Sequence, residues 1–374
     1  MRYTAVANTL RRESAAPEKY SSAVMEDVLS FHESLPDYAK TPLCRLSAYA
    51  AANGVGEVLV KDESHRFGLN AFKGLGGTYA MSRMLAECGR DPAEVTFVTT
   101  TDGNHGKGVS YAAKLFGCSA HVYMPKGTVP VRAEAIRNAG NADVTITDMV
   151  YDDCVKYTSE LAEQNGWLLI QDTSWEGYEQ VPQWIMQGYS TLVSETLAQM
   201  EEDGLARPTH VFLQAGVGAM AGAVIGCLAN VFPDDLPIIS IVEPAEVGCI
   251  YESVRKGDGA PHEAAGSGVT MMAGLNCGTP CTLAWDLIRD HASFAYACDD
   301  EVSAHGMRLL ASPAGTDSAV ISGESGAVTM GLLDLILQSE EERARLGIDE
   351  TSVLLLFSTE GDTDPENYRH IVQQ

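Results

Sequence analysis

Residues 95–117 read VTFVTTTDGNHGKGVSYAAKLFG, and they pass from a strand-like run through a glycine-rich turn into a helix-like run. The same alternation continues along the chain. Strand-like segments lie at 120–124, 143–147 and 167–171, and helix-like segments lie between them at 131–140 and 152–166. Repeated units of this length form a parallel sheet that helices cover on both faces. The stretch therefore predicts an α/β fold.

A second α/β region is expected in the C-terminal half, with strands at 211–214, 238–242 and 353–358 and a polar helix near 339–346. The glycine-rich segment 247–280 is typical of loops with short helices. We predict a compact α/β domain at residues 78–190, inserted between the two parts of a larger domain, which are residues 1–77 and 191–374.

Composition excludes several classes of protein. The chain has 374 residues and a formal net charge of −26, which argues against nucleic-acid binding because phosphate contacts need a basic face. The N-terminus lacks the apolar core of a signal peptide and no stretch reaches membrane-spanning length, so a cytoplasmic protein without a membrane partner is expected. Nine scattered cysteines do not suggest a disulfide framework. Cys277 and Cys281 lack a second ligand pair at zinc spacing, so we expect buried thiols and no metal.

Three glycine-rich segments can carry chemistry, and the first is LQAGVGAMAGAV at 213–224, directly after a predicted strand. Backbone N–H groups at such a turn and the following helix N-terminus can bind a phosphate. The segment is neither a P-loop nor a GxGxxG motif, because Ala221 occupies the third glycine position. A tight turn that serves only packing is the alternative.

The second segment, TTTDGNHGKG at 99–108, offers Asn104 as a ligand for an oxygen atom and Asp102 either as a base or as a cap of the following helix. The third, LNAFKGLGGTYAM at 69–81, places Lys73 among apolar residues, which is expected to lower its pKa as a Schiff-base lysine requires. A surface lysine with its head in water is the alternative. A lysine, an asparagine loop and a phosphate turn together are what a pyridoxal 5′-phosphate (PLP) site must supply.

The chain resembles the fold-type II (tryptophan-synthase-like) PLP enzymes, and among them the diaminopropionate ammonia-lyases. The resemblance is carried by RFGLNAFKGLGG, TTTDGNHGKG, YMPKG, QDTSWEGYE, WIMQGY, LQAGVGAMAG, ISGESGAV and STEGDTD, in this order. It implies two three-layer α/β domains with the active site in the cleft between them. It also implies that Lys73 binds the cofactor covalently, that Asn104 contacts its 3′-hydroxyl and that Ser358 or Thr359 bonds its pyridine nitrogen. The residues implied to hold the phosphate are Gly216, Val217, Gly218, Ala219 and Met220.

One position departs from the related dehydratases and racemases, which carry a serine where this chain has Asp102. A carboxylate there is a stronger base and can attract a second ammonium group, which favours a diamino acid and reaction of both enantiomers. The expected activity is elimination of D- and L-2,3-diaminopropionate to pyruvate and two ammonia, with Lys73 taking the proton of the L-isomer and Asp102 that of the D-isomer.

Two further acids and a histidine complete the expected site. Asp172 is expected to hold the substrate's β-ammonium, with a helix N-cap before residues 175–178 as the alternative. Glu324 is a candidate pocket residue, and His105 is expected to support its loop by hydrogen bonding. Homodimers are usual for the family. A serine or threonine dehydratase and a non-catalytic metabolite-binding protein are the competing hypotheses.

Overall fold

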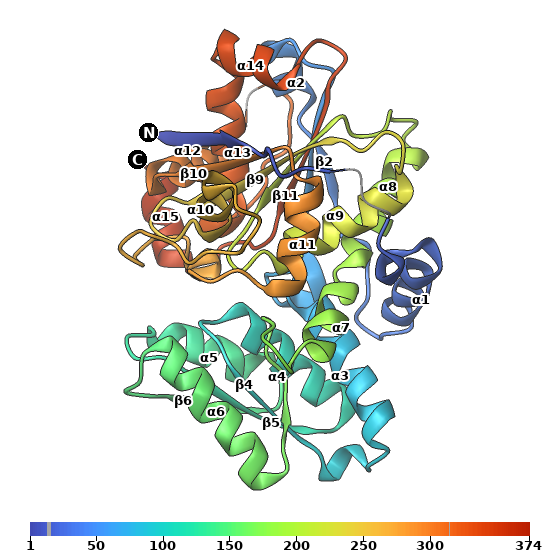
Figure 1. Ribbon diagram of the computed structural model, residues 1–374, viewed down its shortest axis with the longest axis vertical. Helices are drawn as coiled ribbons and strands as arrows, with labels where there is room; N and C mark the ends of the chain where they lie inside the picture. Colours follow the sequence, from blue (N-terminus) through green and yellow to red (C-terminus); the bar gives the residue numbers. More distant parts are fainter. Residues whose placement is uncertain (13–15, 314) are drawn as a thin grey trace.

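The protein is described by a computed structural model that covers residues 1–12, 16–313 and 315–374, and its strands form two sheets (Figure 1). The larger sheet has the strand order β1-β10-β9-β8-β11-β3-β2, and the smaller has the order β6-β5-β4-β7. The strands are β1 (Tyr3–Ala7), β2 (Leu43–Arg45), β3 (Glu57–Asp62), β4 (Thr96–Thr100), β5 (Ser119–Met124), β6 (Ala142–Ile146), β7 (Leu168–Leu169), β8 (His210–Gln214), β9 (Ile238–Pro244), β10 (Phe294–Cys298) and β11 (Val353–Ser358).

Helices alternate with these strands along most of the chain, as the sequence predicts. They are α1 (Ser22–Glu33), α2 (Ser47–Asn53), α3 (Gly74–Cys88), α4 (Asn104–Phe116), α5 (Pro130–Ala139), α6 (Tyr151–Asn165), α7 (Gln180–Gly188), α8 (Ser190–Glu202), α9 (Ala219–Val231), α10 (Cys249–Lys256), α11 (Thr282–His291), α12 (Asp300–Ala311), α13 (Glu324–Leu337), α14 (Glu340–Leu346) and α15 (Pro365–Val372), with the short 3₁₀ helix η2 (Glu63–Gly68) before the third of them. No helix within the described ranges is both long enough and apolar enough to cross a membrane.

The smaller sheet is entirely parallel and has helices on both faces. The chain moves from β4 to β5 to β6 in one direction and then crosses back to β7. Because parallel crossovers are right-handed, α4 and α5 lie on one face and α6 on the other, as Figure 1 shows. The predicted α/β fold of this region is confirmed.

The last strand of the smaller sheet is shorter than predicted. Residues 167–171 were expected to be extended, but β7 contains only Leu168 and Leu169. Beyond it, the side chain of Gln171 replaces the main-chain ladder: its amide accepts from the Thr100 nitrogen at 3.1 Å and donates to the Thr100 oxygen at 3.0 Å. The chain can therefore turn away from the sheet early without leaving these main-chain groups unpaired.

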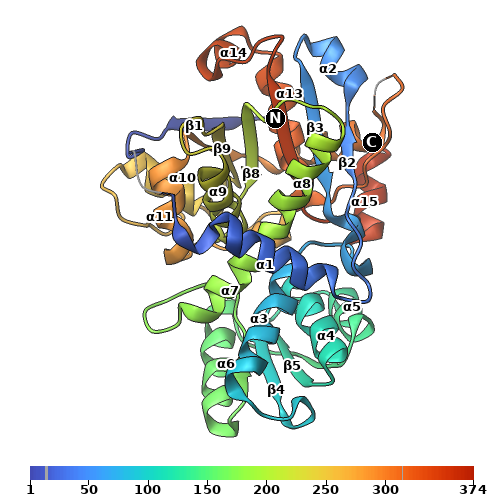
Figure 2. The same cartoon turned by 90° about the vertical axis from the view of Figure 1, so that its right-hand side faces the viewer.

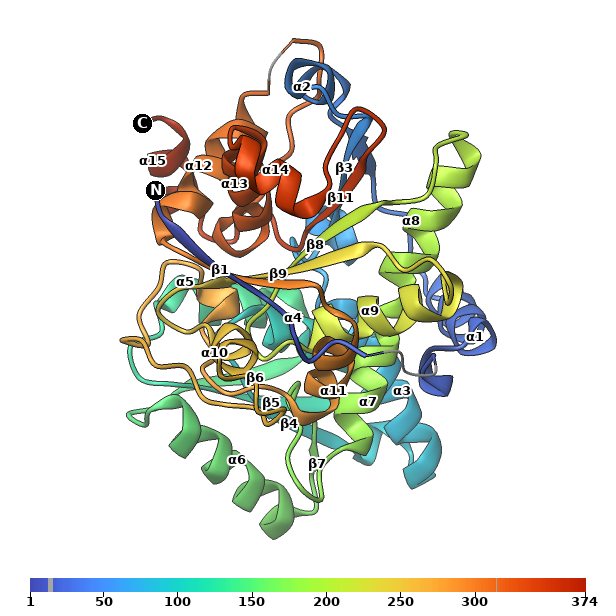
Figure 3. The same ribbon diagram turned by 45° about the horizontal axis from the view of Figure 1, so that its top comes forward.

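The larger sheet is parallel through its centre, with antiparallel strands β1 and β2 at its edges. The strands β8, β9 and β10 follow each other in one direction, and the chain then returns to β11 between β8 and β3. The same handedness rule places α9 to α11 on one face and α12 and α13 on the other, which Figure 3 shows. Each domain thus has three layers.

Helix α7 joins the two sheets and lies between them in both views (Figures 1 and 2). It packs against α3 on one side and α9 on the other. A single hydrophobic cluster extends from Phe97 and Val109 beside the smaller sheet to Val211 and Ile239 in the larger one. The cleft between the sheets is therefore closed at its base by continuous core packing.

A buried cluster of charges anchors the segment that leads into α3. The Arg66 guanidinium donates to Glu63 at 2.8 Å and to Glu195 of α8 at 2.7 Å, and the Lys61 ammonium donates to Glu195 at 2.7 Å. All four side chains are fully buried. Two cations and two carboxylates balance, which is the condition under which such burial is tolerated. The cluster fixes η2 to α8, a few residues before Lys73.

Candidate active site

One pocket lies between the two sheets, at the carboxyl ends of their parallel strands, where α/β folds bind ligands. It gathers nearly every residue that the sequence singles out, although they are spread over most of the chain. These residues are Lys73, Asp102, Asn104, Asp172, Gly216, Val217, Gly218, Ala219, Met220, Glu324 and Thr359. Among the described residues, no group of three or more side chains is arranged to hold a metal ion.

The glycine turn between β8 and α9 has the geometry of an anion cradle. Gly218 has a φ of +90°, which a side chain would strain, and it precedes the first turn of α9 without any side-chain cap. A Cβ at Gly216 would lie 3.1 Å from the Cα and carbonyl oxygen of Leu275. The turn therefore needs both glycines, and it leaves the N–H groups of the α9 N-terminus directed to the pocket.

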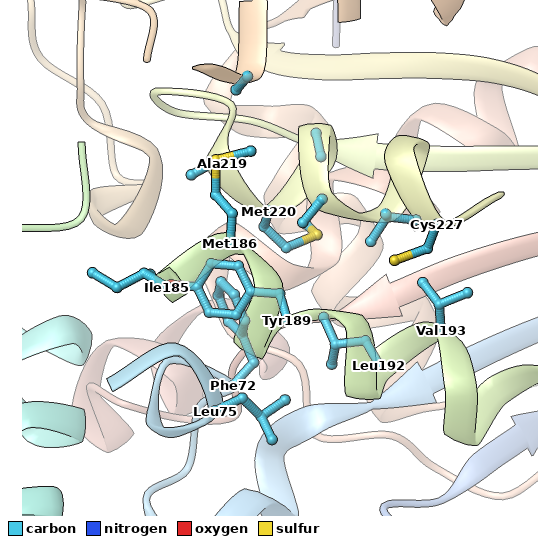
Figure 4. Packing of buried hydrophobic residues seen from close by; sticks show 14 of the residues in the cluster. Phe72, Leu75, Ile185, Met186, Tyr189, Leu192, Val193, Ala219, Met220 and Cys227 are labelled. Atoms are coloured by element: carbon cyan, nitrogen blue, oxygen red, sulfur yellow. The ribbon is translucent and has the colours of Figure 1, made fainter. Parts of the chain in front are cut away.

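Lys73 is held in place by hydrophobic packing on both sides of it. Phe72 and Leu75 are buried, and the Phe72 ring packs against Tyr189 with centroids 4.8 Å apart (Figure 4). The Lys73 ammonium lies 5.4 Å from the centre of the Phe72 ring and 5.9 Å from that of Tyr189. The backbone of Lys73 is thus fixed at the start of α3, and its side chain enters the pocket.

The expected lowered pKa of Lys73 is wrong for this structure. Burial by itself disfavours the charged amine, but the Lys73 nitrogen lies 2.6 Å from the Asp172 carboxylate and the two form an ion pair. The negative charge outweighs the burial and raises the pKa of Lys73. In return, although burial opposes it, the ammonium holds the pKa of Asp172 well below its ordinary value. The carboxylate is 99 residues away in sequence, so local composition could not reveal it.

Asp172 is a pocket residue and does not cap a helix. Residues Trp175 and Tyr178 form a turn with an isolated bridge, and α7 begins only at Gln180. The alternative of a helix N-cap is therefore wrong. His105, beside the pocket, bonds the main-chain oxygen of Ile170 through Nε2 at 2.9 Å, which confirms its expected support of the loop, and its Nδ1 lies 3.8 Å from Asp172.

Asp102 also lacks the capping role that was its alternative. The N-cap of α4 is Gly103, with a φ of +157°, and no side chain caps this helix. Within the described part of the chain, the Asp102 carboxylate accepts no hydrogen bond. Burial raises the pKa of Asp102 to about 6, against the opposing charge of Arg132, while Asp172 adds to the rise. Asp102 is thus a carboxylate in the pocket whose protonation changes near neutral pH.

Another part of the pocket wall contains Asn104, Glu324 and Glu360, whose side chains bond each other or their neighbours. Asn104 donates from Nδ2 to Glu360 at 2.5 Å, and Glu324 accepts a hydrogen bond from Asn367. Burial raises the pKa of Glu324, and the nearby charge of Glu360 raises it further. Lys107 also lines this wall. Glu360 and Lys107 were not selected from the sequence, although both lie inside the motifs that carry the resemblance.

The two hydroxyl residues at the end of β11 differ in position. Ser358 donates to the Ser322 hydroxyl at 2.8 Å and does not line the pocket. Thr359 lines the pocket, and its oxygen accepts a hydrogen bond from Gln214 at 2.9 Å. Thr359 is therefore the hydroxyl accessible to a bound molecule.

Three cysteines lie in or near the pocket. Cys281 is buried, as expected, whereas the expected burial of Cys277 is wrong, because Cys277 lines the pocket and is only partly buried. The sulfur of Cys249 lies 3.7 Å from the main-chain oxygen of Cys277, so these two residues, whose proximity the sequence left open, are neighbours.

The residues present fit pyridoxal phosphate. The uncapped glycine turn suits a phosphate, Lys73 supplies the amine, and the two lie in one pocket. The buried Oε1 atom of Gln214 has no hydrogen-bond partner among the described residues. The Nε2 atom of the same side chain bonds the accessible Thr359.

Comparisons with known proteins agree with this fit. The family model "Pyridoxal-phosphate dependent enzyme" matches residues 35–358. Fold and site together thus define the class: this is a fold-type II PLP-dependent enzyme.

Within this class the chain belongs to the diaminopropionate ammonia-lyase family. It is 45% identical to the diaminopropionate ammonia-lyase of Salmonella typhimurium, over 98% of this chain and 96% of the relative. It is 48% identical to that of Escherichia coli, over 91% of this chain and 89% of the relative. The crystal structure of the Escherichia coli enzyme in complex with an aminoacrylate–PLP azomethine reaction intermediate superposes with a TM-score of 0.93 at 44% identity, covering 99% of this chain and 97% of that one.

Proposed function

We propose that this enzyme eliminates ammonia from D- and L-2,3-diaminopropionate with PLP, giving pyruvate and two ammonia. The observation that carries the proposal is a pair of carboxylates, Asp102 and Asp172, in the same pocket as Lys73. Two anions beside one amine suit a substrate with two ammonium groups. A hydroxy amino acid, the substrate of a dehydratase, has no second ammonium for them to bind.

PLP, when bound, supplies an electron-accepting ring that stabilises negative charge at the substrate's Cα. Lys73 would bind it covalently, and Gly216 to Met220 would hold its phosphate through backbone N–H groups. Asn104 would contact its 3′-hydroxyl. Of the two hydroxyl residues considered for the pyridine nitrogen, we favour Thr359, because Ser358 is directed to Ser322.

The residues of this chain then divide the proton transfers. The substrate's α-amine would take the place of Lys73 on the cofactor and so free the lysine. Lys73 would then accept the Cα proton of the L-isomer once its amine is uncharged, and Asp102 would accept that of the D-isomer. The Cα–H electron pair forms the Cα–Cβ double bond while the Cβ–N bond breaks, so the β-nitrogen leaves with its electron pair as ammonia. The remaining aminoacrylate takes up water and releases pyruvate and the second ammonia.

Asp172 has two roles in this scheme: it pairs with the Lys73 ammonium, and it binds the β-ammonium of the substrate. Its carboxylate holds Lys73 charged in the structure, which would prevent the amine from acting as a base. A substrate β-ammonium bound at Asp172 replaces Lys73 as the partner of that charge. Lys73 then loses the main charge that opposes the effect of burial, which lowers its pKa and favours the uncharged base. Substrate binding thereby prepares the base. Glu324 completes the pocket as a further substrate contact.

The proposed reaction is tested by incubating the PLP-loaded protein with each enantiomer of diaminopropionate and measuring pyruvate and ammonia. We expect two ammonia for each pyruvate with both isomers, and turnover of serine at least tenfold slower. Faster turnover of serine would indicate a dehydratase. Cofactor binding without turnover of any of these amino acids would indicate a metabolite-binding protein.

The Asp172→Asn substitution is expected to lower the pKa of Lys73 below its ordinary value of about 10.4, because burial then acts without the opposing carboxylate. The measurement is a pH titration of ¹³C-methylated lysines in the apoprotein by NMR, with the Lys73 signal assigned by its absence from Lys73→Ala. Asp102→Asn is the matched control, because it leaves the ion pair intact. An unchanged Lys73 pKa in Asp172→Asn would show that the pair does not control the amine.

We further propose that residues 78–190 form the inserted domain and residues 1–77 with 191–374 the larger one. All four strands of the smaller sheet fall within the first range, which supports this division. A homodimer in the cytoplasm is the proposed state of the protein, and sedimentation of the purified protein tests the dimer.

A further inference from the structure

Glu360 is a buried carboxylate in the wall of the pocket that the proposed chemistry does not use. It follows Thr359 after β11 and is 5% exposed. Its Oε1 accepts from the Ser325 nitrogen at 3.0 Å, in the first turn of α13, and its Oε2 accepts from Asn104 Nδ2 at 2.5 Å. Both carboxylate oxygens are thus committed to donors on two different helices.

These two bonds join the two halves of the molecule across the pocket. Asn104 begins α4 of the smaller sheet, whereas Ser325 belongs to α13, which packs on the larger one. The main chain at Glu360 also pairs with Ala71, two residues before Lys73. Glu360 is therefore the point at which the asparagine loop, the lysine loop and the larger sheet meet.

The bond to Glu360 decides how the Asn104 amide is oriented. A carboxylate accepts hydrogen bonds and donates none, so the nitrogen end of the amide must face it. One of the two N–H groups of Asn104 is then committed, and the other remains as the donor for a bound molecule. A side chain that could both accept and donate would allow the amide to turn over.

Lys107 stabilises this arrangement from the same face of α4, three residues after Asn104. Its ammonium donates to the Leu69 main-chain oxygen at 2.9 Å, in the segment before Lys73. Burial lowers the pKa of Lys107 to about 8, and the negative charge of Glu360 opposes this change. The carboxylate thus has a cation near it.

We propose that Glu360 is a positioning residue for the cofactor: it fixes the Asn104 amide so that its remaining N–H is available to the 3′-oxygen of PLP. The inference rests on the PLP site proposed above and goes beyond it, because the proton transfers described there give Glu360 no role. It also links the asparagine loop to the loop that carries Lys73, so that both sides of the ring are placed together.

The test compares Glu360→Gln with Asp362→Asn, measuring PLP affinity by fluorescence titration of the apoprotein. Glutamine keeps the size of the side chain but can bond Asn104 in either orientation, and we expect about tenfold weaker PLP binding and a shifted absorbance maximum of the bound cofactor. Asp362 is the matched control, because it lies in the same loop, accepts a hydrogen bond from Asn70 at 3.1 Å and does not line the pocket. Asp362→Asn should bind PLP with wild-type affinity and spectrum.

A double-mutant cycle separates positioning from simple structural support. If Glu360 acts through Asn104, the Asn104→Ala variant and the Asn104→Ala, Glu360→Gln double variant should lose about the same PLP affinity relative to wild type. Additive losses in the double mutant would overturn the proposal. Thermal unfolding of each apoprotein checks folding, and Glu360→Asp, which keeps the charge, should have an affinity between wild type and Glu360→Gln.

The outcomes also separate this inference from the proposed function. A wild-type protein that fails to bind PLP contradicts the cofactor site itself. A wild-type protein that binds PLP, together with Glu360→Gln and Glu360→Asp variants of unchanged affinity and spectrum, contradicts only the role of Glu360. Equal losses in Glu360→Gln and Asp362→Asn would assign the effect to the loop as a whole, and this too would overturn the proposal.

Discussion

Replacing Lys73 with alanine is expected to abolish the visible absorbance of the lysine-bound cofactor and to lower activity on L-diaminopropionate by at least about 10³-fold. The substitution removes both the amine that binds PLP covalently and the base for the L-isomer, and general-base catalysis alone contributes about 10²–10⁴-fold. The backbone of Lys73 has ordinary helical angles, φ −58° and ψ −22°, so alanine can occupy the position without strain. Absorption spectra of the purified protein and pyruvate formation measure the two effects.

Lys107 is the appropriate control for this result, because it is the other lysine that lines the pocket. Its ammonium is committed to the Leu69 oxygen, so Lys107→Gln is expected to retain the visible absorbance of covalently bound cofactor. A protein that keeps its absorbance in Lys73→Ala and loses it in Lys107→Gln would show that the cofactor lysine has been assigned to the wrong residue.

The fold could be predicted where strands are buried and apolar and are followed by helices. The last strand of the larger sheet, Val353–Ser358, was predicted with its observed bounds, and every residue in it is buried. Strands β1, β2, β3 and β10 were not predicted. The first two are short edge strands with half-exposed patterns, β3 ends in the charged pair Lys61–Asp62, and β10 has the sequence FAYAC without a β-branched residue. Their strand conformation depends on neighbours distant in sequence.

The site was predicted as a set of residues but not as a set of interactions. Lys73, Asp102 and the glycine turn could be named because each lies in a recognisable local pattern. The Lys73–Asp172 ion pair could not, because the two residues are 99 positions apart in sequence and only the folded chain brings them together. Glu360 was overlooked for the same reason, since its bond to Asn104 spans 256 residues. Long-range charge pairing therefore reversed the one pKa that local composition suggested.

The Asp102→Asn substitution is expected to lower activity on D-diaminopropionate by about 10²–10⁴-fold while activity on the L-isomer changes by less than about tenfold. Asparagine keeps the size of the side chain but cannot accept a proton. Lys73, on which the L-isomer depends, keeps its ion pair with Asp172. Steady-state kcat/KM for the two enantiomers measures the ratio, and equal losses on both would contradict the assignment of separate bases.

The pH dependence of the wild-type enzyme provides an independent check of the same residue. Because burial raises the pKa of Asp102 to about 6, its carboxylate is deprotonated above this pH and becomes protonated as the pH falls through it. Only the deprotonated form accepts a proton, so kcat/KM for the D-isomer should fall about tenfold for each pH unit below about 6. The L-isomer depends instead on an uncharged Lys73, so its activity should fall with pH according to the pKa of that lysine and should not follow the limb at about pH 6. The Asp102→Asn variant, in turn, should lose the limb from its residual activity on the D-isomer. A limb at the same pH for both isomers would mean that one group serves both reactions, and the reaction of both enantiomers would then need an explanation other than two separate bases.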